Sequence, residues 1–278
     1  MMNQASMETR DLQEKVRDLC TILKLHAPLL IAYSGGVDST FLLSEAAREL
    51  GNGALGIIAD SPSLPRRSLA QALHNARSFG ARVEVIATNE LSDPRYSSNP
   101  INRCYFCKFE LFQKMRQLAF ERGFAALAYG ENVDDGSRFR PGATAATQFR
   151  VIAPLRSAGL TKSEIRSMSR VRGLPTADLP AQPCLSSRIP HGTEVTQRAL
   201  LMIEVAEEFL RSLGFCIFRV RYIAVGEEDA GAKLQVDADE MEKLEMLHSK
   251  IRDRLRAIGF REVTIDPDGY RPPPSRRP

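Results

Sequence analysis

The first 130 residues alternate between two hydrophobic patterns. Short, almost continuous apolar runs occur at 28–33, 54–59, 82–87 and 125–130. Between these runs, apolar residues recur every three or four positions, which is typical of one helix face. This spacing predicts helices over 12–23, 41–51, 66–79 and 104–121. Apolar strands that alternate with helices predict an α/β fold with a parallel sheet covered by helices on both faces, which binds ligands at the carboxyl ends of its strands.

The pattern changes after about residue 175. The segment LPTADLPAQPCLSSRIPHGTE, residues 174–194, contains four prolines and little periodicity, which predicts an extended loop. The order that follows predicts a small α+β domain: a helix over 196–213, strands over 217–225 and 232–237, a helix over 239–258 and a strand over 261–266. We therefore expect two domains, 1–180 and 181–278.

Composition and charge exclude several classes of protein. The chain has 278 residues, of which 43% are hydrophobic and 26% charged, so it is neither collagen-like nor wholly disordered. Its longest apolar run, PLLIAY, is too short for a membrane span, and its N-terminus lacks the apolar core of a secretory signal. A cytoplasmic location is the expectation. The net charge of +4 does not require a nucleic-acid partner.

The string SGGVDST, residues 34–40, follows the first predicted strand and opens a helix. Gly35 and Gly36 can adopt positive φ and turn backbone N–H groups toward one anion, and Ser34 and Ser39 add hydroxyl donors. The start of the helix adds its dipole. The string is neither a Walker loop nor a dinucleotide fingerprint, and a plain tight turn is an alternative interpretation. Asp38 either helps to hold Mg²⁺ or caps the helix.

The chain has five cysteines, and this odd number favours metal or thiol chemistry over a disulfide framework. Cys104 and Cys107 form a CxxC pair at a helix start, which can face one metal or form a redox disulfide. A tetrahedral zinc site would need a second such pair, which the sequence lacks. Cys184 lies on the proline-rich loop, and Cys20 and Cys216 are expected as packed core thiols. Three thiolates on a [4Fe–4S] cluster would leave one iron open to another ligand.

The string SGGVDS resembles the pyrophosphate-binding loop of the PP-loop ATP pyrophosphatases, which include GMP, asparagine and NAD synthetases and tRNA-thiolating enzymes. Five further strings make the chain similar to one branch of these enzymes, the LarE family: NRCYFCK, GENVDDGSRFRPG, PCLSSRIPHGTEVT, FLRSLGF and FRVR. Members of that family are ATP-dependent sulfur transferases in the biosynthesis of the nickel-pincer nucleotide cofactor of lactate racemase.

The resemblance implies cleavage of ATP, with Mg²⁺, between its α and β phosphates. AMP would activate the carboxylates of pyridinium-3,5-biscarboxylic acid mononucleotide, and sulfur would then replace oxygen. Some members sacrifice the sulfur of one cysteine, whereas others hold a [4Fe–4S] cluster on three cysteines. Cys104, Cys107 and Cys184 match the second type. Family members assemble into oligomers, so a homo-oligomer and other proteins of cofactor biosynthesis are the expected partners.

The resemblance also names candidate site residues. The nucleotide-binding candidates follow strands 1, 2 and 4: Ser34, Gly35, Gly36, Val37, Asp38, Ser39, Thr40, Asp60, Ser61, Gly130 and Asp135. Arg219 and Arg221 alternate on one strand and could grip the substrate phosphate, and Arg188 could bind its carboxylate or AMP. Glu207 could orient or deprotonate the thiol of Cys184. The alternatives are an exposed acidic loop after strand 4, a solvated strand face and a solvated helical glutamate.

Several other functions are compatible with part of this pattern. A tRNA-thiolating PP-loop enzyme would need a basic RNA-binding surface, which the small net charge disfavours. A non-catalytic ATP sensor or metal-storage protein would not need an intact SGGVDS loop beside three cysteines. An amidotransferase synthetase would need a glutaminase domain. A sulfur transferase that sacrifices Cys184 remains the alternative within the same family.

Overall fold

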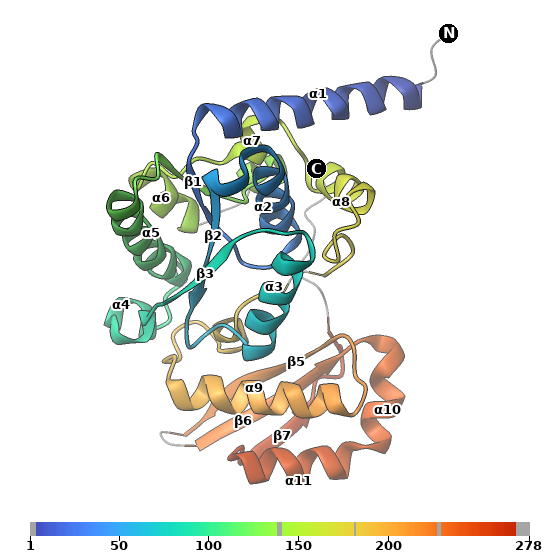
Figure 1. Ribbon diagram of the computed structural model, residues 1–278. Coiled ribbons are helices and arrows are strands. Elements are labelled where there is room, and N and C mark those ends of the chain that lie inside the picture. The colour runs from blue at the N-terminus through green and yellow to red at the C-terminus, as the bar shows by residue number, and fades with distance from the viewer. Residues whose placement is uncertain (1–3, 138–140, 181, 227–228, 271–278) are drawn as a thin grey trace. The chain divides into compact units, whose positions relative to one another are not determined.

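The computed structural model describes residues 4–137, 141–180, 182–226 and 229–270 (Figure 1). These residues form two compact units. The first contains the described residues up to Glu90 together with Asn102–Gln182, and the second contains Leu91–Ile101 together with the described residues from Pro183 onward. The hydrophobic pattern gave no indication that residues 91–101 join the second unit. No helix in the described part of the chain has the length and apolar character needed to cross a membrane.

The first unit is built on a parallel sheet of four strands in the order β3-β2-β1-β4. The strands are β1 (Leu29–Ala32), β2 (Ala54–Asp60), β3 (Val83–Ala87) and β4 (Ala126–Tyr129). The chain runs outward from β1 to β2 and β3 and then returns to the other side of β1 as β4. The order therefore reverses between β1 and β4, and the crevice at such a reversal is where open α/β sheets bind ligands.

Helices cover both faces of this sheet, as the sequence predicts. The helices of the first unit are α1 (Gln4–Leu25), α2 (Val37–Leu50), α3 (Arg66–Ser78), α5 (Arg103–Arg122), α6 (Pro141–Gln148), α7 (Pro154–Ser157) and α8 (Lys162–Val171). Helices α1, α2, α3 and α5 correspond to the helices predicted over 12–23, 41–51, 66–79 and 104–121. The hydrophobic pattern did not predict α6, α7 or α8.

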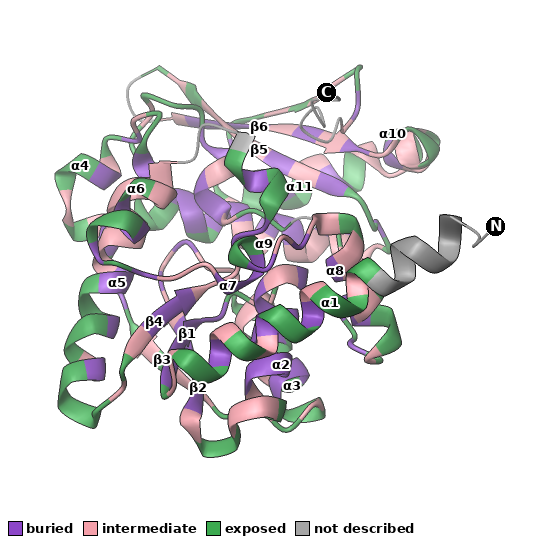
Figure 2. Cartoon of the chain, turned by 90° about the horizontal axis from the view of Figure 1, so that it is seen from above, coloured by how far each residue is buried: buried purple, intermediate pink, exposed green. Residues whose placement is uncertain are grey.

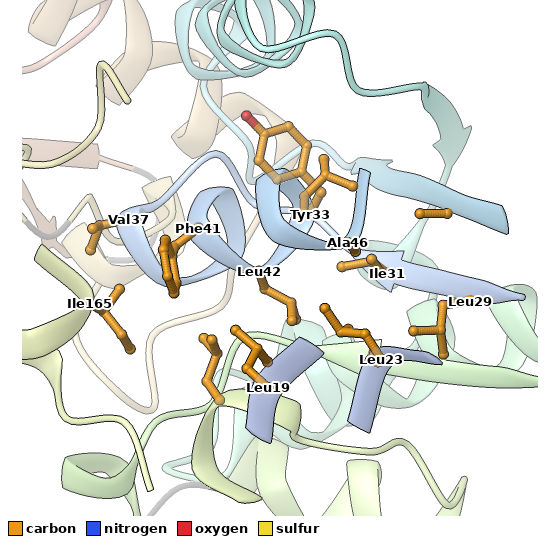
Figure 3. Packing of buried hydrophobic residues seen from close by; sticks show 14 of the residues in the cluster. Leu19, Leu23, Leu29, Ile31, Tyr33, Val37, Phe41, Leu42, Ala46 and Ile165 are labelled. Carbon is orange, nitrogen blue, oxygen red and sulfur yellow. The ribbon is translucent and has the colours of Figure 1, made fainter. Parts of the chain in front are cut away.

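Strand β1 shows why its sequence is apolar at every position. Leu29 and Ile31 belong to a hydrophobic cluster with α1, α2 and α8, whereas Leu30 and Ala32 belong to a second cluster with α5 and α6. Figure 3 shows the first cluster, with labelled side chains from α1 (Leu19, Leu23), α2 (Phe41, Leu42, Ala46) and α8 (Ile165). Figure 2 shows buried positions along β1 and exposed positions along the outer sides of α1 and α5. A strand buried on both faces reads as a continuous apolar run.

The second unit contains a three-stranded sheet in the order β5-β6-β7. Strand β5 (Phe218–Val225) is antiparallel to β6 (Asp229–Val236), which is parallel to β7 (Glu262–Ile265). Its helices are α4 (Pro94–Ser97), α9 (Gln197–Ser212), α10 (Met241–Met246) and α11 (His248–Ile258). The predicted α+β order is confirmed. The helix expected over 239–258 is interrupted at Leu247, where the backbone leaves helical geometry (φ −96°, ψ 2°).

Candidate functional site

The loop between β1 and α2 depends on two glycines. Gly35 has a φ of +75°, and a Cβ atom there would lie 2.8 Å from the Cβ atom of Ala72. Both the backbone conformation and the available space therefore require glycine. Gly36 is extended and caps α2. The Ser39 hydroxyl accepts a hydrogen bond from the Ser34 N–H (3.2 Å) and donates one to the Gly36 carbonyl (3.1 Å), which fixes the loop.

The backbone N–H groups of this loop are available to a ligand. Among the described residues, none accepts a hydrogen bond from the N–H groups of residues 35–39, and the first helical bond runs from the Thr40 N–H to the Gly36 carbonyl (2.9 Å). Gly36 is exposed and Gly35 is partly exposed, whereas Val37 and Thr40 are buried. Successive N–H groups at the start of a helix bind phosphate well.

A second loop, after β4, packs directly on the first. A Cβ atom at Gly130 would lie 2.8 Å from the backbone nitrogen of Ser39 and 3.0 Å from its Cα atom. Asn132 Nδ2 donates to Asp38 Oδ1 (3.3 Å), and the Asn132 N–H donates to Asp135 Oδ2 (3.3 Å). The structure therefore places the predicted residues Gly130 and Asp135 beside the loop between β1 and α2, at the reversal between β1 and β4.

Residues at the N-terminus of α8 also contact these two loops, which the sequence did not predict. Lys162 Nζ forms an ion pair with Asp38 Oδ2, and the Lys162 N–H donates to Asp134 Oδ2 (2.8 Å). The helix begins with a capping box in which the side chains of Thr161 and Glu164 each bind the backbone of the other. The threonine and glutamate three positions apart are a known sign of a helix start and could have identified α8.

The residues around Asp38 fit a Mg²⁺ ion. The ion prefers oxygen ligands, and Asp38 supplies a partly exposed carboxylate. Asn132 is only 1% exposed, and its Oδ1 atom has no hydrogen-bond partner among the described residues. Because buried polar atoms nearly always have a partner, this amide oxygen is a second candidate ligand. Lys162 supplies the cationic charge beside Asp38 in this structure.

Asp60 and Ser61, at the end of β2, are occupied by partners inside the first unit. Asp60 forms an ion pair with Arg66, the first residue of α3. The Ser61 hydroxyl bonds to the Ser63 hydroxyl (2.9 Å), which donates to the buried carboxylate of Glu90 (2.7 Å). The two predicted nucleotide contacts are therefore part of a hydrogen-bonded turn at the carboxyl edge of the sheet.

The three cysteines predicted to bind the iron–sulfur cluster are divided between the two units. Cys104 is exposed and Cys107 partly buried in the first turns of α5, in the first unit, and Cys184 is partly buried in the second unit. Among the described residues of either unit, no three His, Cys, Asp or Glu side chains form a group that could hold a metal. The convergence of all three thiols stays a prediction.

The two remaining cysteines differ from each other. Cys20 is partly buried, and burial, together with the nearby carboxylates of Glu49 and Glu45, raises the pKa of its thiol. The prediction that Cys216 is a core thiol is wrong, because its side chain is exposed. Phe215 is buried, and the next side chain along the chain turns outward as the backbone approaches β5.

The loop that carries Cys184 is anchored by a buried ion pair. Arg188 Nε and Nη2 donate to the two carboxylate oxygens of Glu207 on α9, both at 2.9 Å. Arg188 Nη1 donates to the carbonyl of Cys184 (3.0 Å), and Glu207 also accepts from the Val220 N–H of β5 (3.2 Å). Arg188 and Glu207 were predicted to act on the substrate and the thiol. In the structure they bind each other and fix the backbone of Cys184.

The segment 91–101 supports the same loop from another side. Asn99 is fully buried with a φ of +58°, and its Nδ2 donates to the carbonyls of Pro190 (2.7 Å) and Thr193 (2.9 Å). The hydroxyls of Tyr96 and Ser186 lie 2.7 Å apart. These contacts anchor residues 183–196, which contain almost no regular structure.

Arg219 and Arg221 lie on the face of β5 that points away from the hydrophobic core of the second unit. Arg221 Nη1 donates to the Ser187 carbonyl (2.7 Å), and the Arg219 guanidinium lies 4.8 Å from the ring centre of Tyr270. Burial, and then the positive charge of Arg188, lower the pKa values of both arginines. The three guanidiniums of Arg188, Arg219 and Arg221 outnumber the nearby carboxylates of Glu207 and Asp266, so positive charge is in excess, which suits an anionic ligand.

The chain is similar over most of its length to proteins from other organisms. It is 40% identical to an uncharacterised protein of Synechocystis sp. over 87% of this chain and 89% of the relative. It is 28% identical to the pyridinium-3,5-bisthiocarboxylic acid mononucleotide synthase of Lactiplantibacillus plantarum, over 94% of this chain and 93% of the synthase. A protein of Methanocaldococcus jannaschii is also 28% identical, over 87% and 90%. No protein-family model matches the chain.

These similarities extend over both units, and the features described above lie within them. They include the SGGVDST loop, the CxxC pair and the loop around Cys184, which carry the resemblance seen in the sequence. The identity to the Synechocystis protein is high enough, and covers enough of both chains, to indicate common descent. Together with its match to the Lactiplantibacillus plantarum synthase, it shows that the chain belongs to the LarE family.

Proposed function

We propose that this protein is an ATP-dependent sulfur transferase that converts pyridinium-3,5-biscarboxylic acid mononucleotide into thiocarboxylate products. The observation that supports this most is the convergence of the SGGVDST loop, the loop after β4 and Lys162 at the carboxyl end of β1. The name of the synthase from Lactiplantibacillus plantarum supports the choice of substrate. Both units would be needed, because the nucleotide loop and Cys184 are in different units.

The first half-reaction is adenylation. The N–H groups of residues 35–39 bind phosphate oxygens, and Asp38 with Asn132 Oδ1 would hold Mg²⁺, which neutralises phosphate charge. A substrate carboxylate oxygen forms a bond to the α-phosphorus of ATP, and the bond from that phosphorus to the pyrophosphate oxygen breaks. Pyrophosphate leaves, and the carboxylate becomes an acyl adenylate.

The second half-reaction exchanges oxygen for sulfur. A sulfide sulfur attacks the acyl carbon, the bond to the AMP oxygen breaks, and AMP leaves with the electron pair. Arg219 and Arg221 would bind the phosphate of the mononucleotide through charge-assisted hydrogen bonds. Arg188 and Glu207 keep the backbone of Cys184 in place.

Cys104, Cys107 and Cys184 would hold a [4Fe–4S] cluster, which would supply an iron that can bind sulfide. The donor set fits this chemistry at the CxxC pair, where two accessible thiols lie three positions apart at the N-terminus of α5. The proposal requires Cys184 of the second unit to supply the third thiolate.

Pyrophosphate release tests the adenylation step. The wild-type chain should release pyrophosphate from ATP only when the pyridinium substrate is present, and Asp38→Ala should reduce that release at least tenfold. Asp178→Ala is the matched control, because Asp178 is an exposed, ion-paired aspartate of the same unit. Release from Asp38→Ala at the wild-type rate would contradict the assignment of the nucleotide site.

The iron content of anaerobic preparations tests the cluster. Cys104→Ser, Cys107→Ser and Cys184→Ser should each lose most of the bound iron and most sulfur transfer. Cys216→Ser, which changes an exposed cysteine, should lose neither. If only Cys184→Ser is inactive and the wild-type chain stops after one turnover with a mass loss of about 34 Da, Cys184 is instead the sulfur donor.

A further inference from the structure

Arg221 on β5 is held in place by two neutral groups. Its Nε atom donates to Gln235 Oε1 on the neighbouring strand β6 (2.8 Å), and its Nη1 atom donates to the Ser187 carbonyl (2.7 Å). Within the described part of the chain, Arg221 forms no ion pair, and its Nη2 atom has no hydrogen-bond partner. Arg188 differs, because it is paired with the carboxylate of Glu207. The guanidinium of Arg221 therefore has a fixed position but no counterion of its own.

Gln235 lies between a cation and an anion. Its Oε1 atom accepts from Arg221, and its Nε2 atom donates to Asp266 Oδ2 (2.7 Å), in the residue that follows β7. A carboxylate at this position could not donate to Asp266, and an ammonium group could not accept from Arg221. A side-chain amide satisfies both neighbours, because it presents an acceptor at one atom and a donor at the other.

The neutral amide keeps the carboxylate of Asp266 away from the guanidinium of Arg221. Burial, followed by the positive charge of Arg188, lowers the pKa of Arg221, as expected for a desolvated cation without a carboxylate in contact. A carboxylate at position 235 would neutralise this cation and would compete with a ligand for its N–H groups. An anionic ligand gains most from a guanidinium that is already oriented and not yet paired.

We infer that Gln235 is a positioning residue of the site that binds the substrate phosphate. It holds the guanidinium of Arg221 in place and leaves its positive charge, and its Nη2 atom, to a phosphate oxygen. Arg219 is directly opposite Gln235 in the register of β5 and β6, so all three side chains share one face of the sheet. This inference rests on the proposed function, because it assumes that the two arginines bind the phosphate of the mononucleotide.

Calorimetric titration of the full chain with two probes tests the inference. The probes are pyridinium-3,5-biscarboxylic acid mononucleotide and the corresponding nucleoside, which lacks the phosphate. Gln235→Glu should weaken binding of the mononucleotide about 10- to 100-fold, the usual value of a charge-assisted hydrogen bond, and should leave nucleoside binding nearly unchanged. Gln235→Met removes the contact without adding a charge, so it should weaken the mononucleotide only about three- to tenfold. Gln197→Glu is the matched control, because it adds the same charge at an exposed position of α9.

A double variant separates the effect of charge from that of structure. Gln235→Glu/Asp266→Asn keeps the net charge of the chain and the hydrogen bond between the two side chains, with donor and acceptor exchanged. The amide at position 266 also keeps an oxygen for the Asp268 N–H, which donates to Asp266 Oδ1 (3.2 Å). The negative charge, however, is now in contact with Arg221. The double variant should recover the urea midpoint of the wild type but bind the mononucleotide as weakly as Gln235→Glu does.

The possible failures can be distinguished. If the double variant recovers the affinity for the mononucleotide, or if the single variants weaken both probes equally, Gln235 only maintains the structure of the sheet and the inference is wrong. If both single variants bind the mononucleotide as tightly as the wild type does, the inference is also wrong, but the proposed function stands. If the wild-type chain binds neither probe, the proposed function falls as well.

Discussion

Replacement of Glu207 by alanine should destabilise the second unit and release the loop that carries Cys184. The substitution removes two charge-assisted bonds to Arg188 and the acceptor of the Val220 N–H. Arg188 and Glu207 are each 5% exposed, so the groups that lose their partners are shielded from bulk water. The guanidinium of Arg188 would then be buried without a carboxylate.

Removal of one partner from a buried ion pair costs about 3–5 kcal/mol. Arg188 would keep three acceptors for its Nη1 group: the carbonyls of Pro183 and Cys184 and the hydroxyl of Ser187. The loss should therefore lie near the lower limit, at about 3 kcal/mol. With a urea m-value of about 2 kcal/mol per M, the midpoint of unfolding would fall by about 1.5 M.

Urea unfolding followed by far-ultraviolet circular dichroism measures this effect, since the chain contains no tryptophan to report by fluorescence. Glu208→Ala is the matched control, because Glu208 is the next residue of α9 and forms an ion pair with Arg211 at a side-chain exposure of 44%. An exposed pair contributes at most about 1 kcal/mol. The double variant Arg188→Met/Glu207→Leu should recover most of the lost stability, because no buried charge remains unpaired.

A cost below about 1 kcal/mol for Glu207→Ala, equal to that of Glu208→Ala, would refute this reasoning. A variant as stable as the wild type but inactive in sulfur transfer would indicate that the Glu207 carboxylate acts directly on the thiol of Cys184. In that case the bonds to Arg188 would be incidental to its role.

Gly130→Ala should lower affinity for α,β-methylene ATP at least tenfold and cost about 1–3 kcal/mol of stability, because its new Cβ atom would meet the backbone of Ser39. Gly136→Ala, in the same loop, has 3.5 Å of room to Arg156 and should change neither quantity by much; equal effects would contradict the close packing. Cys20 should be alkylated by iodoacetamide more slowly than Cys216 at pH 8, and its rate should rise as the pH approaches its pKa, since burial raises that pKa and only the thiolate reacts. Peptide mass spectrometry measures both rates, and faster labelling of Cys20 would contradict the burial argument.

The sheet of the first unit could be predicted closely because its signal is local. The run at 54–59 became β2, and the helix expected over 66–79 became α3. A strand that is buried on both faces is apolar at every position, whereas a helix that is buried on one face is apolar at every third or fourth position. These two patterns can be distinguished within a short stretch of sequence. The strand order also explains why the strings after β1 and β4 meet, although their separation along the chain gives no hint of it.

The contacts that complete the site are not local. Lys162 reaches Asp38 across 124 residues, from a short and largely polar helix. Arg188 and Glu207 were each recognised as candidates, but a sequence cannot show that two charges neutralise each other in the interior. A buried pair and two exposed charges have the same residue types, and only the fold distinguishes their roles.

The return of residues 91–101 to the second unit has a consequence for synthesis of the protein on the ribosome. Asn99 binds the carbonyl of Thr193, which is 94 residues later in the chain. At typical rates of translation, about 5–20 s pass between the synthesis of the two residues. During this time residues 91–101 lack their partners, while residues 102–182 of the first unit are being made. A cut near residue 180 would separate this segment from its partners in residues 183–196, so a single cut cannot divide the chain into its two complete units.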